Sequence, residues 1–556
     1  MAMTTGGDLA ILTLLQAGVT RVFALYGGHL EALFQGCRAH QLPVMDVRHE
    51  AAAGYAAEGY ARAGQTLGVA FVTAGPGITN AITSIANAYL DRTPVLYICG
   101  AAPLGSGDTN TVQGGFDQLD LVKPITKWAQ RATEPLAIPR LVAHAIRVAT
   151  TEPTGPVVLE LPIDVSLAPV DLSAAVIPRT IASHTPVQPA PALVRSAIAL
   201  LAAAQRPAIL AGEGVWKSNA AEELRAFAEA SGIPVFADHE AQGAMPSSHR
   251  LYAGRLFSLA NLTAPDERPD AVLALGLRFG TFTLGRSHRL FPADAKLIHV
   301  DVDGRELGRI RDVDVAIAAD SRETLRALLL SYGASNRFDL RAWQERLKHR
   351  DSSRHERFAS LDKGTQRIHP YLAAAAIVEA LESDTVLIGD GAEAAHWLIE
   401  VVRQDTPGSF FTHGQLGALG FGLGFSIGVQ VARPKSQVLC VIGDGGVGIT
   451  FSEFDTMARH GLPIVTVVLN NRSWGATRHF QDLLSGPGKN IAVDLGAARY
   501  DLAAEGLGCQ GYYVTQLADI APAVKAAFAN GKPACINIEV DQAPTPPESE
   551  ILMTST

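Results

Sequence analysis

The sequence lacks several features that mark common protein classes. Its 556 residues contain five cysteines without any Cys-x-x-Cys spacing, and only 6% of the residues are aromatic. Scattered cysteines in apolar runs are typical of buried thiols in a reducing compartment, not of a disulfide framework or a zinc site. No basic start followed by an apolar stretch opens the chain, and no run of about 18 apolar residues occurs. We therefore expect a soluble, cytoplasmic protein that does not associate with membranes.

The sequence also has little positive charge and no basic cluster. Lys and Arg number 46 against 55 Asp and Glu, which gives a formal net charge of −9. Proteins that bind nucleic acid usually concentrate Lys and Arg on one face, so this balance argues against a nucleic-acid partner. What the chain does contain is apolar residues, 47% of the total. Its length suffices for about three or four domains with cores of their own.

Two stretches differ in composition from the rest and predict domain boundaries. Residues 166–192 are rich in Pro, Ser and Thr, and residues 336–366 are rich in charged side chains. These stretches divide the chain into a first domain over residues 1–170, a central domain over 190–335 and a third domain over 366–545.

Short β-branched runs alternate with longer Ala- and Leu-rich segments in all three domains. Examples are GVAFV at 68–72, PAILA at 207–211 and VLCVIG at 438–443. Strands that are apolar throughout, with helices between them, indicate parallel sheets covered on both faces. We therefore predict an α/β protein of three doubly wound parallel-sheet domains, with ligands at the carboxyl ends of the strands. The first and third domains share an order of strand, glycine-rich turn, helix, proline and strand, which predicts a duplicated architecture with a site between the two.

The strongest chemical pattern is Gly443-Asp444-Gly445 after one predicted strand and Asn470-Asn471 after the next, with a helix over residues 452–460 between them. A right-handed crossover brings both strand ends to one edge of the sheet, so Asp444 and Asn471 can face one ion. Oxygen ligands with one formal negative charge suit Mg²⁺ or Ca²⁺ completed by phosphate and water, not Zn²⁺. The glycines after Asp444 expose backbone N–H groups, which favour phosphate binding.

The same residues allow two other interpretations. Gly443, Gly445 and Gly448 fit the Gly-x-Gly-x-x-Gly spacing of a dinucleotide site. Such a site has an acidic residue after the second strand, where this chain has two asparagines. Asp444 could also cap a helix while the asparagines form a turn. Such structural roles are common for any one of these residues but less common for the aspartate and the asparagines together. We favour the metal and diphosphate interpretation.

The combination of GDG with NN at this distance resembles the cofactor motif of the thiamine-diphosphate-dependent enzymes. VRHEAAAGYAAEGYARA, which contains Glu50, and VTAGPGITNAITSIANAYLDRTPV resemble the pyrimidine-binding domain of that superfamily. Within the superfamily the chain resembles the benzaldehyde lyases over nearly its whole length, in stretches such as TNTVQGGFDQ, PITKWA, NNRSWGATRHFQ and PACINIEV. The resemblance implies pyrimidine-binding, central and diphosphate-binding domains, with thiamine diphosphate and Mg²⁺ as cofactors.

The resemblance also implies roles for individual residues. The expected metal ligands are Asp444, Asn471 and the backbone carbonyl of Ser473, and the expected cofactor contacts are Glu50, Gly391, Ala392, Leu419, Gly445, Gly446 and Asn471. Glu50 would hydrogen-bond to the aminopyrimidine ring and so promote loss of the thiazolium C2 proton. His29 would shuttle a substrate proton near neutral pH, and Gln113 would hydrogen-bond to the substrate or to a water.

Each of these residues also has a structural interpretation. Glu50 alone would stabilise a helix N-terminus by about 0.3–1 kcal/mol. A lone histidine such as His29 is usually structural, and Leu419 alone would be an ordinary core leucine. The presence of the GDG and NN pattern favours the catalytic role for Glu50.

The expected substrate pocket departs from the benzaldehyde lyase pattern. Gly28 replaces an alanine, Ile163 replaces a tryptophan, and Ala395 stands where an aromatic residue is expected. Smaller side chains remove stacking surface and add room. With Ala476 and Phe480 they would form an apolar pocket for small aldehydes or 2-hydroxyketones. No motif places an Arg or Lys to bind the carboxylate of a 2-keto acid.

These observations predict a lyase and carboligase that cleaves 2-hydroxyketones to aldehydes and condenses aldehydes to acyloins. The alternatives are an acetolactate-synthase-like 2-keto acid carboligase or decarboxylase and a 2-hydroxyacyl-CoA lyase. A binding protein without turnover is less compatible with Glu50 beside the metal pattern. A nicotinamide oxidoreductase would be distinguished by titration of the apoprotein with thiamine diphosphate plus Mg²⁺ and, separately, with NAD(H). The resemblance further implies a homodimer or homotetramer with active sites at the subunit interface. Whether the central domain binds a flavin or nucleotide stays open, although we interpret GEGVWKSN and GLRFGTF as simple strand–helix turns.

Overall fold

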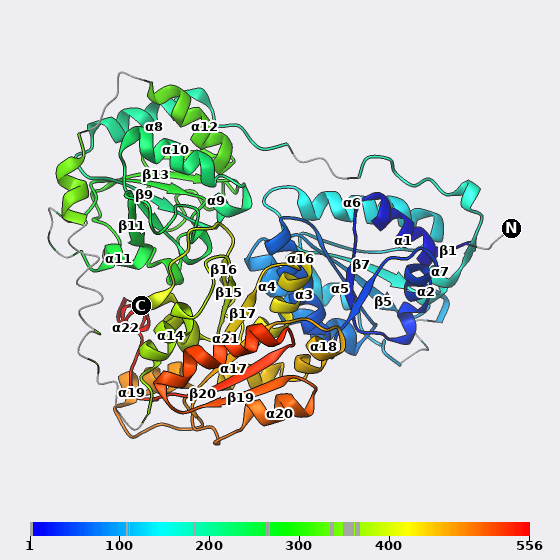
Figure 1. Ribbon diagram of the computed structural model, residues 1–556. Coiled ribbons are helices and arrows are strands. Elements are labelled where there is room, and N and C mark those ends of the chain that lie inside the picture. The colour runs from blue at the N-terminus through cyan, green and yellow to red at the C-terminus, as the bar shows by residue number, and fades with distance from the viewer. Residues whose placement is uncertain are drawn as a thin grey trace.

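The computed structural model describes residues 4–106, 109, 112–181, 185–262, 264, 267–333, 339–347, 358, 361 and 367–555. They form three α/β domains, each built on a six-stranded parallel sheet flanked by helices (Figure 1). The predicted fold class is therefore confirmed. The charged connector predicted over 336–366 lies largely outside the described residues, as do the predicted domain limits at 335 and 366. Within the described part of the chain, no helix combines the length and hydrophobicity that a membrane span requires.

The first sheet has the order β3-β2-β4-β5-β7-β6, and every neighbouring pair is parallel. Its strands are β2 (Val22–Ala24), β3 (Val44–Asp46), β4 (Gly68–Val72), β5 (Val95–Ala101), β6 (Trp128–Arg131) and β7 (Val157–Pro162). Its helices are α1 (Gly6–Gln16), α2 (Glu31–Ala39), α3 (Glu50–Gly64), α4 (Pro76–Leu90), α5 (Gln118–Val122), α6 (Ile138–Thr150) and α7 (Ile163–Leu167). A short antiparallel pair, β1 (Thr4–Thr5) and β8 (Pro169–Val170), joins the two ends of this domain.

The central sheet has the order β11-β10-β9-β12-β13-β14 and is also parallel. Its strands are β9 (Pro207–Ala211), β10 (Val235–Ala237), β11 (Tyr252–Arg255), β12 (Ala271–Leu275), β13 (Lys296–Asp301) and β14 (Val315–Ala318). Its helices are α8 (Pro191–Ala203), α9 (Glu213–Lys217), α10 (Ala221–Ser231), α11 (Leu256–Ala260) and α12 (Ser321–Tyr332).

The third sheet has the order β16-β15-β17-β18-β20-β19. Its strands are β15 (Val386–Asp390), β16 (Phe410–Thr412), β17 (Val438–Gly443), β18 (Val465–Asn470), β19 (Gln510–Val514) and β20 (Ala534–Glu539). Its helices are α14 (Pro370–Glu379), α15 (Ala392–Val401), α16 (Phe421–Ala432), α17 (Asp444–Ile449), α18 (Glu453–Arg459), α19 (Gly475–Ser485), α20 (Tyr500–Gly506), α21 (Ile520–Asn530) and α22 (Pro547–Ser555).

The two outer sheets have the same topology. Numbered along the chain within each domain, their strands lie in the order second, first, third, fourth, sixth and fifth, whereas the central sheet has a different order. This confirms the duplicated architecture predicted from the sequence. In the third sheet the strand order reverses between β15 and β17, and such a switch point is where open α/β sheets bind ligands.

One helix near the predicted metal pattern was not expected. The helix predicted over 452–460 is present as α18, but α17 precedes it and begins directly at Asp444. The segment DGGVGI has three glycines, which disfavour helix, so its sequence reads as a turn. Asp444 is consequently the first residue of a short helix.

The two outer domains of one chain pack tightly through α3 and α16 (Figure 1). A Cβ atom on Gly428 would lie 1.9 Å from the carbonyl oxygen of Ala56, and one on Gly59 would lie 2.2 Å from the carbonyl oxygen of Phe425. Only glycine permits such close backbone approach. The two domains share one hydrophobic core across this contact, so their sheets are held in a fixed relation.

Candidate active site

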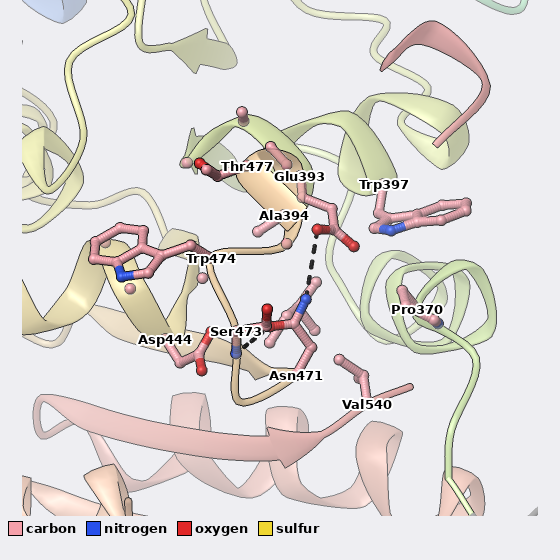
Figure 2. Close-up of a pocket in the computed structure, with 18 of the residues that line it drawn as sticks. Pro370, Glu393, Ala394, Trp397, Asp444, Asn471, Ser473, Trp474, Thr477 and Val540 are labelled. Carbon is pink, nitrogen blue, oxygen red and sulfur yellow. Dashed lines mark hydrogen bonds between the residues drawn. The ribbon is translucent and has the colours of Figure 1, made fainter. Parts of the chain in front are cut away.

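A cavity of about 130 Å³ lies at the carboxyl edge of the third sheet, at its switch point (Figure 2). The turns after β15 and β17 form two of its walls, and the segment after β18 forms a third. The predicted residues that line it are Gly391, Ala392, Leu419, Asp444, Gly445, Gly446, Asn471, Ser473 and Ala476. The structure thus brings together all the predicted metal ligands and all the cofactor contacts predicted in the third domain.

Asp444 has the surroundings of a cation ligand. It is 2% exposed, and its Oδ2 atom has no hydrogen-bond partner among the described residues. The Tyr500 hydroxyl donates to the backbone carbonyl of Asp444 at 3.2 Å and fixes the main chain there. Burial raises the pKa of the Asp444 carboxyl to about 7. A buried carboxylate oxygen without a partner is costly, and a divalent cation would satisfy it.

The two neighbouring asparagines have different roles. Asn470 donates through Nδ2 to the Asn537 side chain at 3.1 Å, inside the sheet. Asn471 lines the cavity, and its Oδ1 atom accepts a hydrogen bond from the backbone N–H of Ser473 at 3.0 Å. A carbonyl oxygen has a second lone pair, so Oδ1 retains capacity for a cation. The donor set of one carboxylate and one amide oxygen therefore fits Mg²⁺.

Backbone and small side chains line the walls beside Asp444. A Cβ atom on Gly445 would lie 2.5 Å from the Trp474 ring, so this position cannot carry a larger residue without displacing the indole. Gly391 has a φ of +84°, a conformation that favours glycine. Walls of this kind allow phosphate oxygens to approach main-chain N–H groups.

Leu419 is held at the cavity by Asp390, a residue that the sequence analysis did not identify. The Asp390 carboxylate accepts hydrogen bonds from the backbone N–H of Gly420 at 3.1 Å and of Gly422 at 2.7 Å. Burial raises the pKa of Asp390 to about 7. Leu419 itself is 36% exposed, so it is not an ordinary core leucine.

The residues predicted in the first domain do not line this cavity. Glu50 is the first residue of α3, is 6% exposed, and accepts a hydrogen bond from Asn80 Nδ2 at 3.0 Å. His29 lies in a short 3₁₀ turn after β2, and its Nδ1 atom is buried without a hydrogen-bond partner among the described residues. Gly28, in the same turn, is exposed, and Ile163 is half-buried at the start of α7.

Gln113 lies against the glycine-rich turn after β4. A Cβ atom on Gly75 would lie 2.8 Å from the Cα atom of Gln113, and both residues have positive φ angles. Gln118 fixes this region, because it accepts from the Gly75 N–H at 2.6 Å and donates to the Gly100 carbonyl at 3.2 Å. The first-domain residues therefore follow strand ends at the carboxyl edge of the first sheet.

Two third-domain residues predicted for the substrate pocket also lie outside the cavity. Ala395 is fully buried on α15. It packs against β15, since a Cβ atom built on Gly389 would lie 3.2 Å from the Ala395 Cβ atom. Phe480 is 46% exposed on α19. Their contact with substrate stays a prediction.

Glu393 and Trp397 line the cavity and were not predicted. Glu393 is 8% exposed, and its Oε1 atom has no hydrogen-bond partner among the described residues. A glutamate in the first turn of a helix ordinarily stabilises the helix dipole, so no sequence signal distinguished this one.

A larger cavity, of about 390 Å³, lies between the first and central domains. Arg92 of the first domain extends there to the end of β13, where it pairs with Asp301 at 2.9 Å and Asp303 at 3.1 Å. A dinucleotide site would keep an acidic residue free for the ribose. Part of the segment GEGVWKSN lines this cavity, and the interpretation of the central glycine-rich segments as simple turns stays a prediction.

Comparison with known proteins identifies the family. Models of the N-terminal, central and C-terminal domains of thiamine pyrophosphate enzymes match residues 4–121, 194–328 and 390–538. A probable acetolactate synthase of Mycobacterium bovis is 32% identical over 539 residues, which cover 96% of this chain and 95% of the relative. A probable acetolactate synthase large subunit of Methanocaldococcus jannaschii is 31% identical, with 97% and 92% covered. The large subunit of acetolactate synthase isozyme 3 of Escherichia coli is 29% identical, with 87% and 85% covered.

These relatives refine the expectation from the sequence. The predicted superfamily and cofactors are confirmed, whereas the relatives are named acetolactate synthases and not benzaldehyde lyases. The chain therefore belongs to the thiamine pyrophosphate enzyme family, with thiamine diphosphate and Mg²⁺ as its cofactors.

Proposed function

We propose that this protein is a carboligase that decarboxylates a 2-keto acid such as pyruvate and joins the remaining acyl unit to the carbonyl carbon of a second substrate. The observation that carries the proposal is the similarity to a probable acetolactate synthase over 96% of this chain. This activity was the alternative to the 2-hydroxyketone lyase in the sequence analysis, and the relatives favour it over that lyase.

In this proposal the third-domain cavity binds the diphosphate end of the cofactor. Asp444, Asn471 and the carbonyl of Ser473 hold Mg²⁺, the turns at Gly391 and Gly445 admit the phosphates, and Leu419 supports the ring system. When bound, thiamine diphosphate supplies the nucleophilic carbon that attacks the substrate carbonyl. The unpartnered Oδ2 atom of Asp444 supports the cation assignment.

Glu50 would hydrogen-bond to the aminopyrimidine ring. Because Glu50 does not line the cavity of its own chain, we propose that a second copy supplies it and that the working unit is a homodimer or homotetramer. Enzymes of this family are typically dimers or tetramers. Exposed apolar side chains on elements that border the cavity support burial by a partner: Leu419 is 36%, Phe480 46% and Ile449 56% exposed.

A second candidate, the 2-hydroxyketone lyase, is favoured by one observation. Among the described residues that line the cavity, none is Arg or Lys. A substrate carboxylate would therefore need its counter-charge from elsewhere, whereas an aldehyde or acyloin needs none. In that case His29, with its unpartnered Nδ1 atom, would exchange the hydroxyl proton.

Substrate assays with the holoenzyme separate these functions. The protein is incubated with thiamine diphosphate, Mg²⁺ and either pyruvate, small aldehydes alone, or a 2-hydroxyacyl-CoA thioester, and CO₂ and carbon–carbon products are measured. The proposal predicts CO₂ release with acetolactate formation from pyruvate. Acyloin formation from aldehydes with no CO₂ release from pyruvate would replace it with the lyase, and thioester cleavage would replace it with the CoA lyase.

A further inference from the structure

We propose that Glu393 is a positioning residue of the cation site, which holds the amide of Asn471 so that its oxygen is available to the metal. This inference rests on the metal assignment in the proposed function. It concerns a buried carboxylate on α15 that no motif of the sequence singles out. Figure 2 shows the Glu393 side chain directed into the cavity toward Asn471.

The contact between the two side chains fixes the orientation of the amide. Glu393 Oε2 lies 3.5 Å from Asn471 Nδ2, and the backbone N–H of Ser473 donates to Asn471 Oδ1 at 3.0 Å (Figure 2). A carboxylate only accepts hydrogen bonds and a backbone N–H only donates, so the two partners select opposite ends of the amide. The Asn471 oxygen is thereby kept on the Ser473 side of the residue.

Residue 475 cannot carry a side chain without displacing the Glu393–Asn471 contact. A Cβ atom on Gly475 would lie 1.5 Å from Glu393 Oε2 and 2.7 Å from Asn471 Nδ2. The absence of a side chain at residue 475 is therefore a condition for the contact. Glycine at this position supports a specific role for the Glu393–Asn471 pair.

The rest of the Glu393 carboxylate has no competing hydrogen bond. Its Oε1 atom is buried without a hydrogen-bond partner among the described residues, and the His479 Nε2 atom lies 3.7 Å from it. His479 Nε2 is likewise buried without a hydrogen bond in the described structure. Glu393 is thus held in the cavity wall by packing and by Asn471, as expected of a partner that orients a metal ligand.

The test measures cation affinity directly and not turnover. Mg²⁺ is titrated into the full-length protein at saturating thiamine diphosphate, and the fluorescence of Trp474 and Trp397 in the cavity wall reports binding. Glu393→Leu removes the acceptor, and we expect it to weaken Mg²⁺ binding by about 10–100-fold, the usual effect of losing a partner that orients a metal ligand. Glu393→Gln keeps an acceptor oxygen and should stay within about threefold of the unmodified protein.

Two further variants sharpen the test. Gly475→Ala displaces Glu393 without changing it and should weaken Mg²⁺ binding as Glu393→Leu does. Glu400→Gln is the matched control, because Glu400 is a buried glutamate of the same helix that pairs with Arg255 at 3.3 Å and does not line the cavity. It should leave Mg²⁺ affinity unchanged. Circular dichroism and thermal unfolding of each apoprotein establish that the variants fold.

The Mg²⁺ affinities of these variants decide between the positioning role of Glu393 and the cation site itself. Unchanged affinity in Glu393→Leu overturns the proposal, and so does a loss in Glu393→Gln as large as in Glu393→Leu, because the charge and not the hydrogen bond would then matter. If Asp444→Ala also left Mg²⁺ affinity unchanged, the cation site itself would be misplaced. A loss in Asp444→Ala without one in Glu393→Leu would reject the positioning role alone.

Discussion

The carboxyl edges of the two outer sheets share one strand order but differ in how their polar groups are satisfied. At the first edge Gln118 bridges Gly75 and Gly100, and Asn80 pairs with Glu50. Among the described residues, His29 Nδ1 and Thr73 Oγ1 are buried there without a partner. At the third edge the carboxylates of Asp444 and Glu393 each have an oxygen beside the cavity that finds no hydrogen-bond partner in the described part of the chain. The same topology therefore gives one edge with several internal hydrogen bonds and another whose unpartnered carboxylate oxygens favour a bound ligand.

We propose that the two edges contribute different parts of one active site. In our proposal the third edge binds the cation and the phosphates within a single chain, whereas the described residues of the first edge do not line that cavity. The tight contact of α3 with α16 fixes both edges within one chain. Completion of the site by a second copy stays part of the proposal, and substitutions at the two edges test it.

The largest effect is expected at the third edge. Asp444→Ala should weaken Mg²⁺-dependent binding of thiamine diphosphate by roughly a hundredfold to a few thousandfold, since loss of a buried charge partner costs about 3–5 kcal/mol. Tryptophan fluorescence titration measures the affinity. The exposed Asp519 of the same domain supplies the control variant Asp519→Ala, which should bind normally. Equal affinities in the two variants would remove the distinction between the edges.

At the first edge the effect should fall on turnover and not on binding. Glu50→Gln should lower the catalytic rate by at least about a hundredfold while thiamine diphosphate affinity changes by less than about tenfold. Steady-state kinetics and the same titration measure the two quantities. Exposed Glu134 serves for a control substitution to Gln. Near-normal turnover in Glu50→Gln would exclude the catalytic role.

Substitution of Leu419 should lower the turnover rate more than it lowers the stability of the fold. Because it is 36% exposed, Leu419→Ala should cost well under the about 2–5 kcal/mol of a core truncation, yet lower turnover by about tenfold. Leu398, fully buried on α15, is the matched comparison, and Leu398→Ala should lose stability instead. Urea unfolding and kinetics distinguish the two. A Leu419→Ala variant whose activity follows only its folded fraction contradicts the assignment.

The smallest effect is expected in the glycine-rich turn after β4, against which Gln113 lies. Gly75 has a φ of +62°, so Gly75→Ala should cost about 1–3 kcal/mol of stability from backbone strain. Urea unfolding measures this cost. Gly105→Ala is the control, because a Cβ atom there meets nothing within 4 Å. If both variants unfold at the same urea concentration, the first edge is more adaptable than its hydrogen bonds indicate.

The sequence predicted the elements whose signals are local. Apolar β-branched runs gave the strands, and GDG with NN gave a site at two adjacent strand ends, because parallel topology forces those ends together. Glu393 was missed, since its contact with Asn471 depends on where α19 and Gly475 pack. Asp390 was missed for a similar reason, as its partners are main-chain N–H groups of a loop distant in sequence. The separation of Glu50 from the cavity also depends on the packing of whole domains.

The most direct test of the central claim is to locate the cation. A crystal structure of the protein with thiamine diphosphate and Mn²⁺ in place of Mg²⁺ gives the metal position from its anomalous scattering. We expect one Mn²⁺ ligated by Asp444 and by the amide oxygen of Asn471, with the diphosphate in the third-domain cavity. Mn²⁺ and diphosphate bound elsewhere, with Asp444 free of both, would contradict the account.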